Sequence, residues 1–283
     1  MLSVIVTTYN RKEQLTATIN SILSQTIGDF ELIVVDNFSN YDFFELIDSF
    51  KDKRIRPFQN KNNGIISINR NFAISQAKGE ILAFCDDDDM WFSNKLEKCM
   101  KYIPEYDVVY HCFKTTTGEK MRRKPLGNKP CVDLISNNEI IYSSVVIKKS
   151  ILDRVGFFDE KSEMVAIEDW DYWIRVSLIT NKFKCINENL GSYYIGTGNV
   201  SNTVDGVKKL TVIFDKYSNV LDYADKLRAE ALFEYNVARF LHKKHMFNEA
   251  IAKYKQALYG KLSLSIKIRI IVFLFLSKIE VIR

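Results

Sequence analysis

The fold class is decided by Ile81-Leu-Ala-Phe-Cys-Asp-Asp-Asp-Asp89, a short apolar run that stops abruptly at four consecutive aspartates. Apolar runs of this length with polar ends are typical of buried β-strands. Leu2–Thr8 and Phe30–Asp36 have the same design, and the apolar residues between positions 15 and 23 recur at helical spacing. A strand, a helix and a second strand in this order predict parallel βαβ units, and therefore an α/β fold.

Polar residues follow all three predicted strands, at Thr8, Asp36 and Asp86–Asp88. The carboxyl ends of parallel strands meet at one edge of a sheet, and ligands of open α/β sheets bind there, where the strand order reverses. We therefore expect these polar side chains to face one cleft.

The length and composition limit the other possibilities. The 283 residues can form one large α/β domain and a smaller appendage, and the net charge of +5 is too modest to indicate a nucleic-acid partner. The five cysteines form no CxxC pair, which favours reduced thiols in the cytoplasm. We expect neither a signal peptide nor a membrane-spanning segment, since no apolar stretch approaches roughly 20 residues.

The second half of the chain changes character twice. Residues 114–138 form a loosely patterned basic stretch, expected to be a surface loop or hairpin, and from about Val207 the pattern is helical and basic. We predict a catalytic domain over residues 1–206 and a helical region with a basic amphipathic tail over residues 207–283. Residues 229–259 fit either a single tetratricopeptide-type hairpin or a plain helical hairpin.

The four aspartates at positions 86–89 indicate a metal site. Carboxylates about 4 Å apart repel by roughly 4 kcal/mol per pair at an effective dielectric constant near 20, so a cation between them is a natural partner. Oxygen ligands suit Mg²⁺ or Mn²⁺. The alternative is a solvated turn with one aspartate as the N-cap of the following helix, which accounts for Asp89 and Asp88 but leaves Asp86 and Asp87 unexplained.

A second acidic cluster, Glu168-Asp169-Trp170-Asp171, opens a predicted helix with Trp170, Trp173, Ile174 and Ser177 on one face. Acidic residues at a helix N-terminus are commonly only favourable partners of the helix dipole. Combined with the first cluster, they favour a general base.

Five segments, in this order, resemble the motifs of the family-2 glycosyltransferases: Val4-Ile-Val-Thr-Thr-Tyr-Asn-Arg11, Ile33-Val-Val-Asp-Asn37, Asn69-Arg-Asn71 with Ala77-Lys-Gly-Glu80, Phe84-Cys-Asp-Asp-Asp-Asp-Met-Trp91 and Ile167-Glu-Asp-Trp-Asp-Tyr-Trp-Ile-Arg175. The resemblance covers roughly residues 1–200. It implies a GT-A fold, with a Rossmann-like mixed sheet and flanking helices, followed here by a C-terminal helical extension. It also implies a metal-dependent transferase that uses a nucleoside diphosphate sugar, usually of uridine, and inverts the anomeric configuration.

The resemblance assigns roles position by position. Asp169 matches the catalytic base, with Glu168 beside it, and Asp86 and Asp88 match the metal-binding pair for Mn²⁺ or Mg²⁺. The nucleotide-binding positions, which include a base-holding aspartate and an arginine near the diphosphate, are Thr7, Thr8, Tyr9, Arg11, Asp36, Arg70, Asp86 and Asp87. Three positions depart from the family pattern: Thr8 replaces a proline, Asn37 an aspartate, and Ile167 a histidine found in many relatives.

The resulting hypothesis is a hexosyltransferase of a bacterial cell. It would move glucose, galactose or an N-acetylhexosamine from a UDP-sugar to a lipid-linked surface glycan, such as O-antigen or capsule, and form a β-glycosidic bond. A glycoside hydrolase, which also needs two acids, and a degenerate platform that binds partners without turnover are the alternatives.

The tail, residues 262–283, is apolar with basic residues spread through it. Its first nine residues alternate like a strand, but the apolar run that follows favours a basic helix lying on the inner face of the cell membrane. The competing interpretation is an element that packs on the catalytic domain or in a homodimer.

Overall fold

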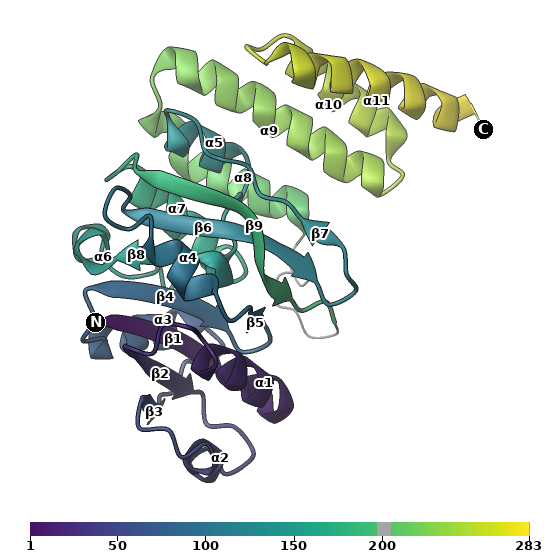
Figure 1. The fold of residues 1–283 in the computed structure, drawn as a ribbon. Helices are drawn as coiled ribbons and strands as arrows, with labels where there is room; N and C mark the ends of the chain where they lie inside the picture. The colour runs from purple at the N-terminus through teal and green to yellow at the C-terminus, as the bar shows by residue number, and fades with distance from the viewer. Residues whose placement is uncertain (197–204, 283) are drawn as a thin grey trace. The chain divides into compact units, whose positions relative to one another are not determined.

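The computed structural model describes residues 1–196 and 205–282, drawn in Figure 1. The chain divides into two compact units. The sheet unit comprises Met1–Asn128 and Glu139–Val200, and the helical unit comprises Lys129–Asn138 and Ser201–Arg283.

A mixed β-sheet forms the centre of the sheet unit, with the strand order β3–β2–β1–β4–β8–β6–β9–β5 and with β7 paired to β6. Strands β1 to β4 run parallel, whereas β8 is antiparallel to β4. From β1 the strand order runs one way to β2 and β3 and the other way to β4. The carboxyl ends of β1 and β4 therefore form the switch point at which ligands bind in such sheets. The strands are β1 (Leu2–Thr8), β2 (Phe30–Asp36), β3 (Ile55–Gln59), β4 (Ile81–Asp86), β5 (Met90–Trp91), β6 (Val108–Thr115), β7 (Lys120–Met121), β8 (Val146–Lys148) and β9 (Phe183–Tyr193).

Helices cover both faces of this sheet. On one face, buried side chains of α1, α2 and α4 pack against alternate residues of β1, β2 and β4. On the other face, Phe84 of β4 contacts the rings of Tyr142, Phe158 and Trp173. Both faces are apolar, which explains why β1, β2 and β4 read as continuous apolar runs. The helices of this unit are α1 (Lys12–Leu23), α2 (Phe43–Ser49), α3 (Ile66–Gln76), α4 (Lys95–Met100), α6 (Lys149–Val155) and α7 (Glu168–Ser177), with short 3₁₀ turns η1 (Tyr142–Ser144) and η2 (Ser162–Met164).

Residues 114–138 contain more structure than the loop or hairpin that their sequence predicts. The hairpin is present, because β7 pairs antiparallel with β6. The sequence does not predict α5 (Pro130–Ser136), which groups with the helical unit. Proline at the first helical position is favourable, and Val132, Leu134 and Ile135 of this helix are buried.

The helical unit is built around α9 (Tyr223–Lys243), with α5, α8 (Gly206–Tyr217), η4 (Ser218–Val220), α10 (Phe247–Leu258) and α11 (Leu264–Ile282). An ion pair joins Arg228 of α9 to Asp133 of α5 at 2.9 Å. The predicted helical hairpin is present as α9 and α10, with small residues such as Ala238 and Ala250 buried between the helices. The tail is helical, so the strand-like alternation over residues 262–270 is misleading. Across the residues that the structure describes, no helix is both long enough and apolar enough to cross a membrane.

Candidate active site

The three strand ends meet as the sequence predicts. In the parallel register, Thr8 of β1 lies opposite Asp36 of β2, and Thr7 lies opposite Asp86 of β4. The polar residues that follow β1, β2 and β4 therefore share one edge of the sheet.

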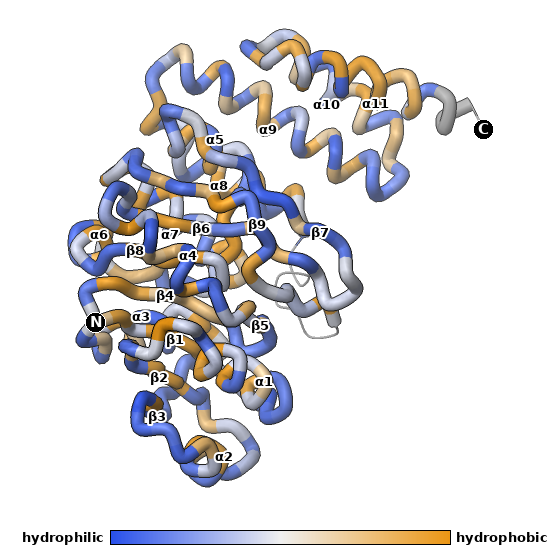
Figure 2. Tube along the Cα trace, in the orientation of Figure 1, coloured by the Kyte–Doolittle hydropathy of each residue, from blue (hydrophilic) through white to orange (hydrophobic). Residues whose placement is uncertain are grey.

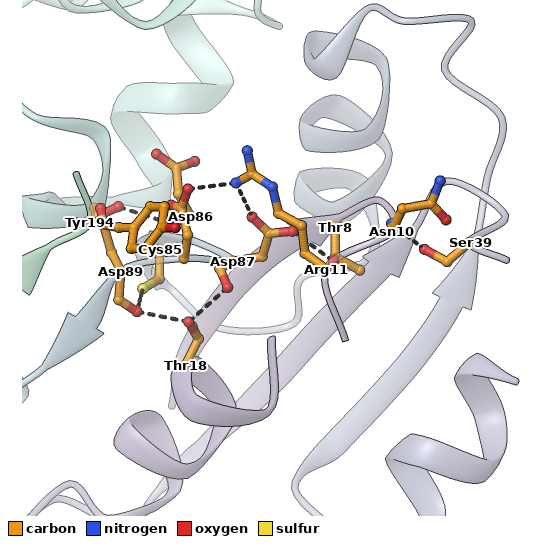
Figure 3. A network of polar contacts seen from close by, with 12 residues as sticks. Thr8, Asn10, Arg11, Thr18, Ser39, Cys85, Asp86, Asp87, Asp89 and Tyr194 are labelled. Carbon is orange, nitrogen blue, oxygen red and sulfur yellow. Dashed lines mark hydrogen bonds and ion pairs between the residues drawn. The ribbon is translucent and has the colours of Figure 1, made fainter. Parts of the chain in front are cut away.

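Side chains of the first motif hold the aspartate run in place. The hydroxyl of Thr8 donates to Oδ2 of Asp87 at 2.7 Å, and Nη1 of Arg11 contacts Asp87 Oδ1 at 3.0 Å and Asp88 Oδ2 at 2.5 Å. From α1, the hydroxyl of Thr18 lies within 2.9 Å of the carbonyl oxygens of both Asp87 and Asp89 (Figure 3). Thr18 was not predicted as a site residue, although a polar residue on the buried face of an amphipathic helix is a signal that the sequence contains.

Asp89 has a different role from the other three aspartates. Its side chain is fully buried and accepts a 2.9 Å hydrogen bond from the backbone N–H of Tyr194. The helix α4 begins only at Lys95, and its N-cap residue is Asn94. The alternative in which Asp89 caps this helix is therefore wrong; Asp89 instead ties the end of β4 to the end of β9.

The carboxylates carry more negative charge than their surroundings balance. Burial, followed by the charges of Asp86 and Asp87, raises the pKa of Asp88 to about 7. Burial also raises the pKa of Asp87, against the opposing effect of Arg11. An additional cation at this position would relieve the repulsion.

The donor atoms suit a cation only in part. Asp86 and Asp88 offer hard oxygen ligands, but each already contacts an arginine through one oxygen. Within residues 1–196 and 205–282, no group of three or more ligating side chains is arranged to hold a metal ion. Two carboxylates fit Mn²⁺ or Mg²⁺ if a diphosphate and water supply the remaining oxygens, as is usual for Mg²⁺.

Arg70 of α3 joins the two acidic clusters. Its guanidinium is buried, donates from Nη1 to Glu168 Oε1 at 2.7 Å and from Nη2 to Asp86 Oδ1 at 3.0 Å, and lies 3.7 Å from the ring centroid of Tyr142. Nε of Arg70 and Oε2 of Glu168 are buried without a hydrogen-bond partner among the described residues. Arg70 thus pairs with a residue that is 98 positions later in the chain and holds Asp86 of the other cluster on the same guanidinium.

Asp169 lies in the first turn of α7, beside Glu168. Its Oδ1 accepts a 2.6 Å hydrogen bond from the backbone N–H of Trp170. Burial raises the pKa of Asp169, and the charge of Glu168 raises it further. A carboxylate with a raised pKa at a strand-end site is suited to accept a proton at neutral pH. The preceding Ile167 is 2% exposed, so the side chain at this departure from the family pattern packs in the core.

The remaining predicted residues occupy the β1–β2 end of the same edge. Asp36 is fully buried, and it accepts hydrogen bonds from Ser39 N at 3.0 Å and from Gln59 Nε2 at 3.0 Å. Tyr9 is 53% exposed, which leaves its ring open to a ligand. The hydroxyl of Ser39 also accepts a hydrogen bond from the backbone N–H of Asn10 (Figure 3). Neither Ser39 nor Gln59 was expected from the sequence.

Known proteins share both the motifs and the fold. Residues 3–158, more than half of the chain, match the family model described as Glycosyl transferase family 2. UDP-Glc:alpha-D-GlcNAc-diphosphoundecaprenol beta-1,3-glucosyltransferase WfaP of Escherichia coli is 29% identical over 205 residues, which are 71% of this chain and 80% of that protein.

Solved structures show the same fold at low identity. Residues 1–349 of TarS from S. aureus in complex with UDP-GlcNAc superpose with a TM-score of 0.68, at 22% identity, over 90% of this chain and 80% of that one. The mannosyltransferase PcManGT from Pyrobaculum calidifontis in complex with GDP-Man and Mn²⁺ gives a TM-score of 0.64, at 15% identity, over 99% and 86%. The predicted GT-A fold is confirmed, and the chain belongs to glycosyl transferase family 2.

Proposed function

We propose that this glycosyltransferase moves a hexose or an N-acetylhexosamine from a UDP-sugar to a lipid-linked glycan acceptor with inversion, so that an α-linked donor gives a β-glycosidic bond. The observation that carries the proposal is the buried Arg70, which holds Glu168 and Asp86 on one guanidinium. This arrangement sets the carboxylates of α7 beside those at the end of β4, as a displacement between a donor and an acceptor requires.

The donor half of the site is the edge formed by β1, β2 and β4. Thr7, Thr8 and Tyr9 would contact the base and ribose, with Asp36 holding the loop that follows β2 in place for the base. Arg11 and Asp87 are already paired, and Arg70 contributes positive charge close to Asp86. The two guanidinium groups, of Arg11 and Arg70, favour a bound diphosphate. TarS, a protein of the same fold, binds UDP-GlcNAc, which supports a uridine nucleotide.

Asp86 and Asp88 would hold a divalent cation, Mn²⁺ or Mg²⁺, together with oxygens of the diphosphate. When bound, this cation would neutralise the charge that develops on the departing diphosphate. PcManGT, which has the same fold, is complexed with Mn²⁺.

Asp169 would remove the proton from the acceptor hydroxyl, a contribution typically worth 10²- to 10⁴-fold in rate. Glu168 would act as a positioning residue, because its Oε1 is bound to Arg70 and its charge raises the pKa of Asp169. Membership of a transferase family argues against the glycoside hydrolase alternative.

We place the reaction in the cytoplasm, at the inner face of the cell membrane. The name of WfaP gives an acceptor linked to diphosphoundecaprenol, a lipid that lies in the bilayer, whereas a UDP-sugar is water-soluble. An enzyme that joins two such substrates must work at a membrane surface.

Thermal unfolding with UDP, Mn²⁺ or both tests the donor site. A ligand present at about 100 times its Kd adds roughly 2.7 kcal/mol of stability, enough for a clear rise in melting temperature. We expect a rise that needs both components, that Asp88→Ala abolishes, and that the exposed control Asp153→Ala retains. If UDP gives no shift in either condition, the donor assignment is wrong. If the expected rise is found, transfer assays with UDP-glucose, UDP-galactose and UDP-N-acetylhexosamines would identify the sugar.

A further inference from the structure

The helix α11 carries two apolar stripes on opposite sides. One stripe is packed inside the helical unit, where Ile270 is fully buried and Phe273 stacks on Tyr254 with ring centroids 5.7 Å apart. The other stripe follows the spacing i, i+4, i+7, i+8, i+11 and i+12 and is exposed. Its members are 44–74% exposed: Leu264, Ile268, Ile271, Val272, Phe275 and Leu276. Figure 2 shows the resulting hydrophobic colour along α11.

The packing of the first stripe fixes which side of α11 remains open. Ser277 is fully buried, and its hydroxyl lies 2.9 Å from Nδ1 of His242 on α9. At about 100° per residue, Ile270, Phe273 and Ser277 point away from Ile271 and Phe275. The helix therefore cannot bury the exposed stripe by rotating without losing these contacts.

Basic side chains flank the exposed stripe. Lys267 and Lys278 lie along one edge, and Arg269 lies along the other, by the same helical geometry. Among the side chains of α11 that the structure describes, these three are the charged ones, and no ion pair joins them to a carboxylate of a described residue. At the start of the helix, Arg228, Lys261 and Lys267 also line a pocket of about 520 Å³.

We propose that this face of α11 binds an anionic lipid surface. Apolar side chains would enter the boundary between headgroups and acyl chains, while the flanking cations would contact lipid phosphates. A second copy of the chain is the poorer occupant, since pairing two such faces would bring cations of the same sign together. All of these residues belong to the helical unit, so binding to a lipid surface does not depend on the proposed transfer reaction.

Co-sedimentation of the full chain with vesicles tests the proposal, using phosphatidylcholine vesicles with and without phosphatidylglycerol. We expect binding to the anionic vesicles, and we expect this binding to weaken in 0.5 M salt. At that ionic strength the attraction between the cations of α11 and the lipid phosphates is screened beyond roughly 4 Å. Ile271→Glu with Phe275→Glu should reduce the partition coefficient at least about tenfold, because two apolar anchors become charges on the anionic surface.

The matched control is Phe157→Glu with Leu178→Glu, two residues of the sheet unit that are 59% and 50% exposed. This control should bind vesicles like the unmodified protein, and both double variants should unfold at unchanged temperatures. The triple variant Lys267→Gln, Arg269→Gln, Lys278→Gln should weaken binding to the vesicles that contain phosphatidylglycerol and leave any binding to pure phosphatidylcholine vesicles unchanged. The proposal is overturned if the unmodified protein binds neither vesicle, if the α11 variant binds normally, or if α11 substitution instead dissociates a dimer in sedimentation velocity.

Discussion

The Nη1 group of Arg70 donates a 2.7 Å hydrogen bond to Oε1 of Glu168, a residue 98 positions later in the chain. The same guanidinium contacts Asp86 at 3.0 Å through Nη2. One buried cation therefore connects the strand-end carboxylates with the helix that carries Asp169. The relative position of Asp86 and Glu168 therefore depends on Arg70.

Replacing Arg70 with methionine should lower the free energy of unfolding by about 3 kcal/mol, because the buried carboxylate of Glu168 loses its partner. Urea denaturation measures this loss. Arg54→Met is the control, since Arg54 pairs with Asp52 only two residues away and its side chain is 29% exposed. We expect the control to cost less than about 1 kcal/mol. Equal losses in the two variants would show that the Arg70 bridge is not a principal source of stability.

Asp169→Asn should reduce turnover by roughly 10²- to 10⁴-fold, while the affinity for UDP changes little, because the base acts on the acceptor and not on the nucleotide. Initial rates and UDP titration would separate the two effects. Asp171→Asn is the control on the same helix: its carboxylate binds Nε of Arg175 at 2.9 Å, so we expect lower stability with the rate of the chemical step retained. Near-normal turnover of Asp169→Asn with an intact fold would rule out the base assignment.

The pH dependence of turnover should report on Asp169. A general base works as the carboxylate, so kcat/KM falls as the pH decreases through the pKa of Asp169. Since burial and Glu168 raise this pKa, the fall should occur above the pH near 4 at which exposed aspartates titrate. Glu168→Gln removes the second cause and should move the fall to lower pH. The exposed Glu163→Gln should leave the profile in place; an unmoved profile in Glu168→Gln would contradict the coupling.

Strands with two buried faces were predictable because their apolar runs stop abruptly at polar residues, as β4 does at Asp86. The edge strand β3 was missed, since Arg56 and Pro57 interrupt the apolar pattern, and proline is tolerated at a sheet edge. Motif order supplied the candidate site residues, but local patterns say nothing about pairs distant in sequence. The Arg70–Glu168 contact and the burial of Asp89 both depend on tertiary packing that single segments do not encode.

His111 of β6 is a buried group that the sequence patterns gave no reason to single out. Its ring is fully buried, Nδ1 lies 2.8 Å from the carbonyl oxygen of Cys112, and Nε2 has no partner among the described residues. Burial, with a further contribution from Lys95, lowers the pKa of His111 to about 3. The folded state therefore keeps this ring neutral at pH values where the unfolded chain protonates it.

This difference predicts a loss of stability in mild acid. An unfolded histidine binds a proton below about pH 6.5, and the folded state does not until about pH 3, so stability falls as the pH decreases through this window. Between pH 7 and pH 5, His111 should cost about 2 kcal/mol. His111→Asn removes the titrating group, so its free energy of unfolding should fall by about 2 kcal/mol less than that of the unmodified protein over the same interval. Urea denaturation at several pH values gives both curves. The carboxylates titrate alike in the two proteins and cancel in the difference, so parallel curves would mean that His111 is protonated in the folded state.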